Sequence, residues 1–131
     1  MSPYSAAAKQ YQQVNVQSSV VDASPHRLVQ MLFEGALQRI AEAKGAMLRS
    51  DIALRGEKIS KAINIVQGLQ GSLNDTEGGD LSASLDQLYD YIARRLIEAN
   101  RQSDPAMLDE CGRLLGEIKT AWDGISAGPG V

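Results

Sequence analysis

The chain has 131 residues, of which 44% are hydrophobic and 5% aromatic, and this length is sufficient to bury one hydrophobic core. Its 13 basic and 16 acidic residues are mixed along the sequence and leave a formal net charge of −3. Without a large positive field, nucleic acid and anionic membrane surfaces are poor partners. No apolar run approaches the roughly 20 residues of a membrane helix, and the N-terminus lacks a signal-peptide pattern. We therefore expect one cytoplasmic domain with no membrane insertion, and the lone Cys111 suits a reducing compartment.

Residues 1–23 are rich in Gln and Ser, and we interpret them as a mobile N-terminal arm. The first helix is predicted to begin at Ser24 and Pro25. The serine side chain can accept a hydrogen bond from the first turn, and proline has the φ angle of the first helical position. Apolar residues then recur at helical spacing as far as about Leu48.

Three further helices follow from the pattern of breaks. The stretch "LRSDIALRGEKI" ends the first helix and begins the second, and "LNDTEGGDLS" separates the second from the third. Asp104 is predicted to cap a fourth helix that opens with Pro105 and reaches about Ile125. The tail, residues 126–131, is rich in Gly and Pro and is expected to be flexible.

Each predicted helix carries one main apolar stripe, as helices that surround a common core do. The stripes include Ile52 in the second helix, Leu81 in the third, and Cys111, Trp122 and Ile125 in the fourth. Short connections between such helices favour neighbours that run in opposite directions. The predicted fold is therefore all-α, an antiparallel up-down four-helix bundle over residues 24–125, with its handedness left open.

Residue types that carry catalysis are sparse in this sequence. His26, the only histidine, falls in the first turn of the first helix, where we expect it to be exposed. A di-iron bundle needs paired Glu-x-x-His spacings, which one histidine cannot supply. The acidic turn that starts at Asp75 has Asp80 where a calcium loop needs glycine, and Asp86 where it needs glutamate. We predict no enzyme, no metal site, no cofactor and no small-molecule substrate.

Several apolar residues lie off the main stripes. They are Met31, Phe33 and Leu37 in the first helix, Leu54 and Ile65 in the second, and Tyr91 and Ile97 in the third. Single exposed apolar residues are ordinary, but a contiguous group of them tends to mark a partner site. The alternative is that the arm folds back over them with its own apolar residues.

Five segments, in this order and spacing, closely resemble the flagellin export chaperone family, FliS. They are Tyr11, "VDASPHRLVQMLFEGAL", "KISKAINIVQGLQGSL", "LDQLYDYIARRLIEANRQSD" and "LLGEIKTAW". The resemblance spans nearly residues 11–125. Phe33 stands where the family more often has tyrosine, so the aromatic ring is kept and a hydroxyl group is lost.

The resemblance implies a chaperone that binds the C-terminal segment of flagellin in the cytoplasm. It would prevent premature polymerisation and keep flagellin competent for flagellar type III secretion, with the export apparatus as a second partner. The partner's amphipathic helices would lie in a groove on the bundle. The candidate groove and lid residues are Tyr11, Val14, Leu54, Ile65, Tyr91 and Ile97. A histidine phosphotransfer-type signalling bundle is the alternative function, and a self-associating structural bundle is a third.

Overall fold

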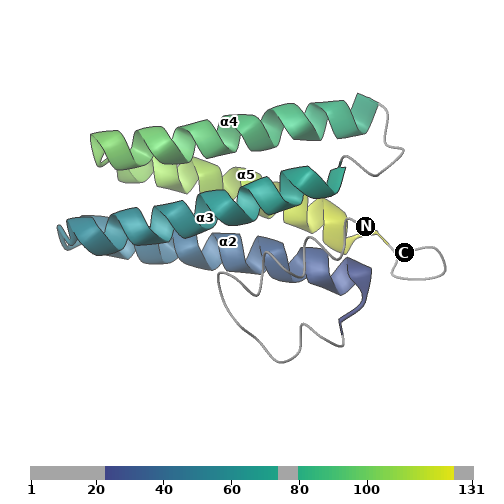
Figure 1. Ribbon diagram of the computed structural model, residues 1–131, viewed down its shortest axis with the longest axis horizontal. Helices are drawn as coiled ribbons and strands as arrows, with labels where there is room; N and C mark the ends of the chain where they lie inside the picture. The colour runs from purple at the N-terminus through teal and green to yellow at the C-terminus, as the bar shows by residue number, and fades with distance from the viewer. Residues whose placement is uncertain (1–22, 74–79, 126–131) are drawn as a thin grey trace.

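The computed structural model describes residues 23–73 and 80–125, and these form a bundle of four helices without strands. The helices are α2 (Pro25–Leu48), α3 (Ile52–Leu73), α4 (Asp80–Gln102) and α5 (Pro105–Asp123). Each helix packs against its neighbours in the chain, and α5 returns to pack against α2. Figure 1 shows that consecutive helices run in opposite directions. The predicted all-α four-helix bundle is confirmed, whereas residues 1–22 of the arm and the tail lie outside the described residues.

The predicted start signals form the caps that their chemistry allows. Ser24 Oγ accepts a hydrogen bond from the Arg27 N–H at 3.1 Å, and Pro25 is the first residue of α2. Asp104 Oδ1 accepts from the Ala106 N–H at 2.9 Å, and Pro105 begins α5. These caps satisfy N–H groups that a helix start leaves free.

Two serines in the short turns between helices adopt a left-handed backbone conformation. Ser50, between α2 and α3, has a φ of 60°, and Ser103, between α4 and α5, has a φ of 53°. Residues with a Cβ rarely adopt this left-handed region. Arg55 donates to Asn100 Oδ1 at 2.8 Å and to Ser103 Oγ at 3.0 Å. At this end of the bundle, the first turn of α3 is therefore hydrogen-bonded to the end of α4 and to the turn that follows it.

The core extends over a wider arc of each helix than a single stripe. Met31, Phe33 and Ile65, expected off the stripes, are all buried, and the side chain of Ile65 is 0% exposed. The reason is that a helix in a bundle packs against two neighbours, so its buried arc exceeds the width of one stripe. The expectation that Ile65 lies on an outer surface is wrong.

The opposite error occurs at the helix ends. Ile52 is 68% exposed, Leu81 is 67% exposed and Ile125 is 47% exposed, although the sequence pattern places all three on core stripes. The apolar repeat continues into the first and last turns of a helix, but the neighbouring helices do not always extend far enough to cover the apolar side chains there. Among the described residues, no helix is long and apolar enough to cross a membrane.

Cys111 should be unreactive toward thiol reagents until the bundle unfolds. It is fully buried, its Sγ lies 3.7 Å from the carbonyl oxygen of Ile92, and burial raises the pKa of the thiol to about 12. The reactive thiolate is therefore scarce at neutral pH and has no access to solvent. A chromogenic disulfide reagent should label the chain at the rate of unfolding, measured with and without denaturant. Rapid labelling of the native chain would contradict this packing.

Ser50→Gly should stabilise the bundle by up to about 1 kcal/mol, because glycine adopts a left-handed backbone conformation without steric strain. Part of this gain is lost, since glycine also gives the unfolded chain more conformational entropy. Ser103→Gly should give a smaller gain, since it also removes the hydrogen bond from Arg55. Urea denaturation gives the free energy of unfolding of both variants. Equal gains from the two substitutions would show that the Arg55 contact does not stabilise the turn.

Candidate binding cleft

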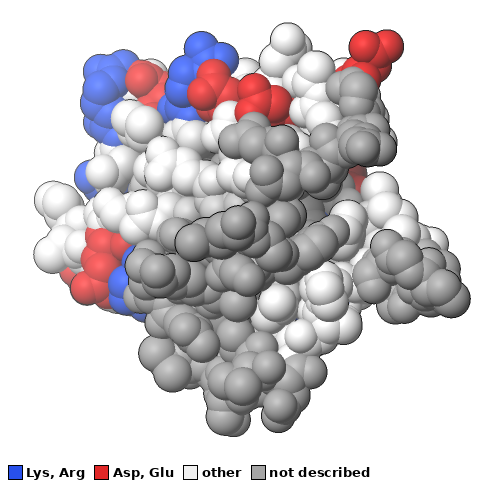
Figure 2. Space-filling view, turned by 45° about the vertical axis from the view of Figure 1, so that its right-hand side comes forward, with Lys and Arg blue, Asp and Glu red and all other residues white. Residues whose placement is uncertain are grey.

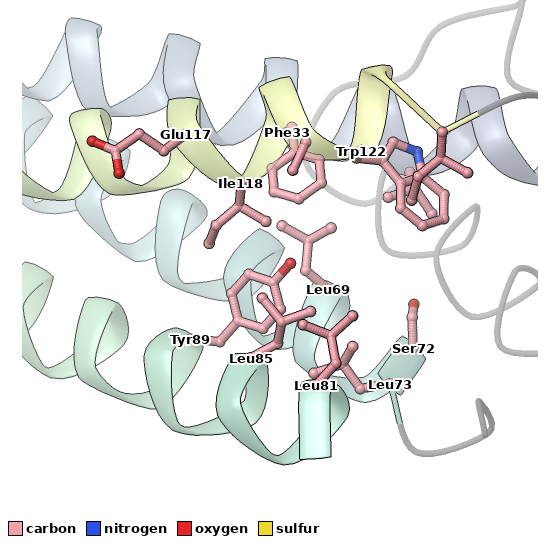
Figure 3. A pocket seen from close by; sticks show the side chains of 13 residues that line it. Phe33, Leu69, Ser72, Leu73, Leu81, Leu85, Tyr89, Glu117, Ile118 and Trp122 are labelled. Carbon is pink, nitrogen blue, oxygen red and sulfur yellow. The ribbon is translucent and has the colours of Figure 1, made fainter. Parts of the chain in front are cut away.

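An apolar cleft with a volume of about 390 Å³ lies where the first half of α4 faces the last turns of α5. Its lining consists of Val29 and Phe33 from α2, Leu69, Ser72 and Leu73 from α3, Leu81, Leu85 and Tyr89 from α4, and Glu117, Ile118, Ala121, Trp122 and Ile125 from α5 and the residues after it. Figure 3 shows the α4 side chains facing those of α5, with Phe33 and Leu69 between them. The floor of the cleft is therefore formed by buried core residues, and its two walls are the facing sides of α4 and α5.

Three polar side chains of the lining, those of Ser72, Glu117 and Trp122, have partners within the chain. Ser72 Oγ donates to the carbonyl of Gly68 at 3.1 Å, and the carboxylate of Glu117 pairs with Arg113 at 2.8 Å. The indole N–H of Trp122 donates to a backbone carbonyl of α2 at 3.0 Å. Burial raises the pKa of Tyr89 well above its usual range, so its hydroxyl stays uncharged. The cleft therefore offers apolar contact and shape to a ligand.

Large apolar side chains stand exposed at the mouth of the cleft. Leu81 of α4 and Ile125 after α5 both line the cleft and are 67% and 47% exposed. In Figure 2, charged side chains gather along the upper edge, where α4 lies, and the described surface below them is mostly uncharged. Exposed apolar residues that adjoin an apolar cleft are the usual mark of a binding site for a partner.

A polar bridge joins α4 and α5 at residues that follow the cleft lining along α4 and precede it along α5. Tyr91 Oη donates to one carboxylate oxygen of Glu110 at 2.6 Å, and Arg95 Nε donates to the other at 2.8 Å. The Tyr91 hydrogen bond, followed by that from Arg95, lowers the pKa of Glu110. Tyr91 is 37% exposed and does not line the cleft. It thus lies where the two helices close on each other.

The remaining predicted groove residues are not brought together. Ile97 is 56% exposed on the outer face of α4, among the ion pairs that Asp90 makes with Arg94 and Glu98 makes with Arg101. Leu54 is half-buried on α3 beside a shallow depression near the α2–α3 turn.

Tyr11 and Val14, the predicted lid residues, lie outside the described residues. Ile65 is in the core, as described above. The mouth of the cleft instead contains Leu81 and Ile125, which the sequence pattern assigned to the core. The available signal was their position in terminal turns, where no neighbouring helix covers them.

His26 is buried, 6% exposed, and the expectation that it is exposed is wrong. Its Nε2 lies 3.0 Å from the carbonyl oxygen of Trp122, and Trp122 Nε1 donates to the carbonyl oxygen of His26 at 3.0 Å. The two rings are stacked, with centroids 5.0 Å apart and planes inclined by 14°. The end of α5 covers the histidine, which sequence alone did not reveal. A phosphotransfer reaction needs an exposed histidine, so this burial argues against the signalling alternative.

Comparison with known proteins identifies the family. A family model described as flagellar protein FliS matches residues 7–129. The flagellar secretion chaperone FliSB of Pseudomonas aeruginosa is 51% identical over 120 residues, which cover 92% of this chain and 95% of that protein. The flagellar secretion chaperone FliS of Vibrio cholerae is 43% identical over 115 residues, 88% of this chain and 85% of the relative.

The FliS protein of Salmonella typhimurium, also a flagellar secretion chaperone, is 43% identical over 119 residues, 90% of this chain and 88% of the relative. The match thus includes all four helices and every side chain that lines the cleft. A helical bundle with an apolar cleft open at one end is a structure that can hold an unfolded or helical partner segment. The chain therefore belongs to the FliS family of flagellar secretion chaperones.

Proposed function

We propose that the cleft between α4 and α5 binds the C-terminal segment of flagellin in the cytoplasm. The chaperone would thereby prevent premature polymerisation and keep flagellin competent for flagellar type III secretion. The observation that carries the proposal is the apolar cleft whose mouth exposes Leu81 and Ile125. Membership of the FliS family supports a flagellar export substrate as the partner.

The physical properties of the cleft favour an amphipathic helix as the bound form. Leu81, Leu85 and Tyr89 recur at intervals of four residues along one face of α4, and the side chains of α5 face them. A third helix laid between these walls would bury its apolar face, as in other helix-in-groove complexes. A segment that is disordered before binding loses conformational entropy, so a few buried apolar anchors must provide the affinity.

The other candidate residues have different parts in this proposal. Tyr91 follows the cleft lining along α4, so a bound helix that reaches this far would contact its ring. Leu54 and Ile97 lie away from the cleft, and only a segment that continues around the bundle would contact them. Tyr11 and Val14 of the arm would cover the cleft until flagellin displaces them.

The action proposed is binding without catalysis and without a cofactor. Among the residues that the structure describes, no three His, Cys, Asp or Glu side chains form a group that could hold a metal ion. The remaining exposed surface would be free for the flagellar export apparatus, which we propose as the second partner. The histidine phosphotransfer alternative is disfavoured by the burial of His26.

Leu81→Asp and Ile125→Asp should each weaken binding of the flagellin C-terminal segment by more than about 1 kcal/mol, because each places a carboxylate at the apolar mouth. Both residues are well exposed, so the melting temperature should change little. Leu48→Asp is the matched control, since Leu48 is 67% exposed at the other end of the bundle. Calorimetric titration measures the affinities. Wild-type affinity in both cleft variants, or equal weakening by the control, would place the site elsewhere.

Replacing Tyr11 and Val14 together by serine should strengthen apparent binding of the flagellin segment and speed its association. A lid that occupies the cleft lowers the fraction of chains competent to bind, and a polar lid would occupy it less. The matched control replaces Gln12 and Gln17 by serine, which changes the arm without removing apolar side chains. Stopped-flow fluorescence gives the association rate. An unchanged rate would show that these arm residues do not cover the cleft.

A further inference from the structure

We infer that His26 and Trp122 form a clasp that positions the α5 wall of the cleft, which makes His26 a positioning residue for partner binding. His26 does not line the cleft, whereas Trp122 does. The functional part of the inference rests on the proposed function, because it takes flagellin as the ligand that binds in the cleft. Its structural part concerns the chain alone and can be tested without a ligand.

The clasp joins positions that are 96 residues apart in the chain through reciprocal hydrogen bonds. The ring nitrogen of each residue pairs with the backbone carbonyl of the other, at 3.0 Å in both cases. The Trp122 carbonyl belongs to the last turn of α5, where it accepts a hydrogen bond from the N–H of Ile125 at 3.0 Å. Because a carbonyl oxygen only accepts, Nε2 of His26 is the donor in this pair and gives the Trp122 carbonyl a second hydrogen bond. The stacked rings hold the two reciprocal bonds in place.

A second contact holds the same turn of α5 to α2. The carboxylate of Asp123 accepts from Gln30 Nε2 at 2.8 Å and pairs with Lys119 at 2.6 Å. The hydrogen bond from Lys119, followed by that from Gln30, lowers the pKa of Asp123 and keeps it ionised. The end of α5 is thus fixed from the α2 side by Gln30 and His26.

On the α4 side, Glu110 and Cys111 of α5 make polar contacts to Tyr91, Arg95 and the carbonyl of Ile92. Cys111 precedes Trp122 by about three helical turns. Beyond these contacts the two helices face each other across the cleft, so the α5 wall depends on its attachment to α2.

This attachment determines the shape of the cleft. The indole of Trp122 lies against His26 and also lines the cleft near Phe33. Loss of the imidazole would leave a void behind the indole and remove the hydrogen bond from α2 to the Trp122 carbonyl, whose other donor, the Ile125 N–H, comes from the turn that ends α5 itself. The end of α5 would then be held less firmly to α2, and the wall would move. A site that is already in its bound shape avoids the cost of ordering on binding, and the clasp provides this preorganisation.

Trp122 is the only tryptophan of the chain, so its fluorescence reports on the clasp directly. In the full chain without ligand, His26→Ala should shift the emission to the red and increase quenching by acrylamide. The matched control is Leu108→Ala, a fully buried residue at the far end of α5 that does not line the cleft. It should lower the melting temperature and leave the emission and quenching unchanged.

Titration of the flagellin C-terminal segment at a temperature where circular dichroism shows all variants folded then tests the functional part. His26→Ala should weaken binding about tenfold, the size typical of losing an anchor or its support, and Leu108→Ala should not. His26→Gln, whose amide can reach the Trp122 carbonyl, should recover part of the affinity. Equal losses in His26→Ala and Leu108→Ala, or unchanged emission and quenching in His26→Ala, would overturn the clasp.

Failure of the flagellin proposal gives a different result. In that case the wild-type chain itself does not bind the segment, and the apolar dye 1-anilinonaphthalene-8-sulfonate replaces it as the probe of the cleft. Altered dye binding together with altered Trp122 quenching in His26→Ala, but not in Leu108→Ala, would support the clasp independently of flagellin. Unaltered dye binding in His26→Ala would overturn it.

Discussion

The packing of α2 against both α3 and α5 is the interaction on which the rest of the structure depends. Residues along the whole length of α2 are buried, from His26 in its first turn to Met47 in its last. The same helix supplies Phe33 to the floor of the cleft and His26 and Gln30 to the end of α5. The cleft thus has a fixed base and one fixed wall because a single buried helix provides both.

The two ends of the bundle are built differently. At one end, the chain makes tight turns at Ser50 and Ser103, and Arg55 of α3 hydrogen-bonds to Asn100 and Ser103, which holds α3 close to the end of α4. At the other end, α5 finishes against α2, and α4 faces it across the cleft. Residues there have the periodicity of core residues but no helix to pack against. A stable bundle and an apolar binding surface therefore come from the same amphipathic pattern.

Helix boundaries could be predicted from the sequence because caps and prolines act locally, as at Pro25 and Pro105. The resemblance to the FliS family was likewise carried by contiguous segments and is confirmed. The binding cleft could not be predicted in this way. Leu81 is exposed because the neighbouring helices do not extend far enough to cover it, and Ile65 is buried because two neighbouring helices together cover a wide arc of α3. The burial of His26 depends on a residue at the other end of the chain.

The internal satisfaction of the polar groups in the cleft has a consequence for what the chaperone can tolerate in its substrate. Ser72, Trp122 and Glu117 direct their hydrogen bonds and charge to other parts of the chain, so few directional groups remain for a ligand to match. A pocket of this kind distinguishes one aliphatic side chain from another by only about 1 to 3 kcal/mol. For a segment bound in this cleft, exchange of one apolar residue for another would change the affinity roughly 10- to 200-fold, whereas a site built on matched hydrogen bonds discriminates by roughly 10⁴- to 10⁵-fold. The apolar pattern of the export substrate would therefore be constrained more strongly than the identity of its individual apolar residues.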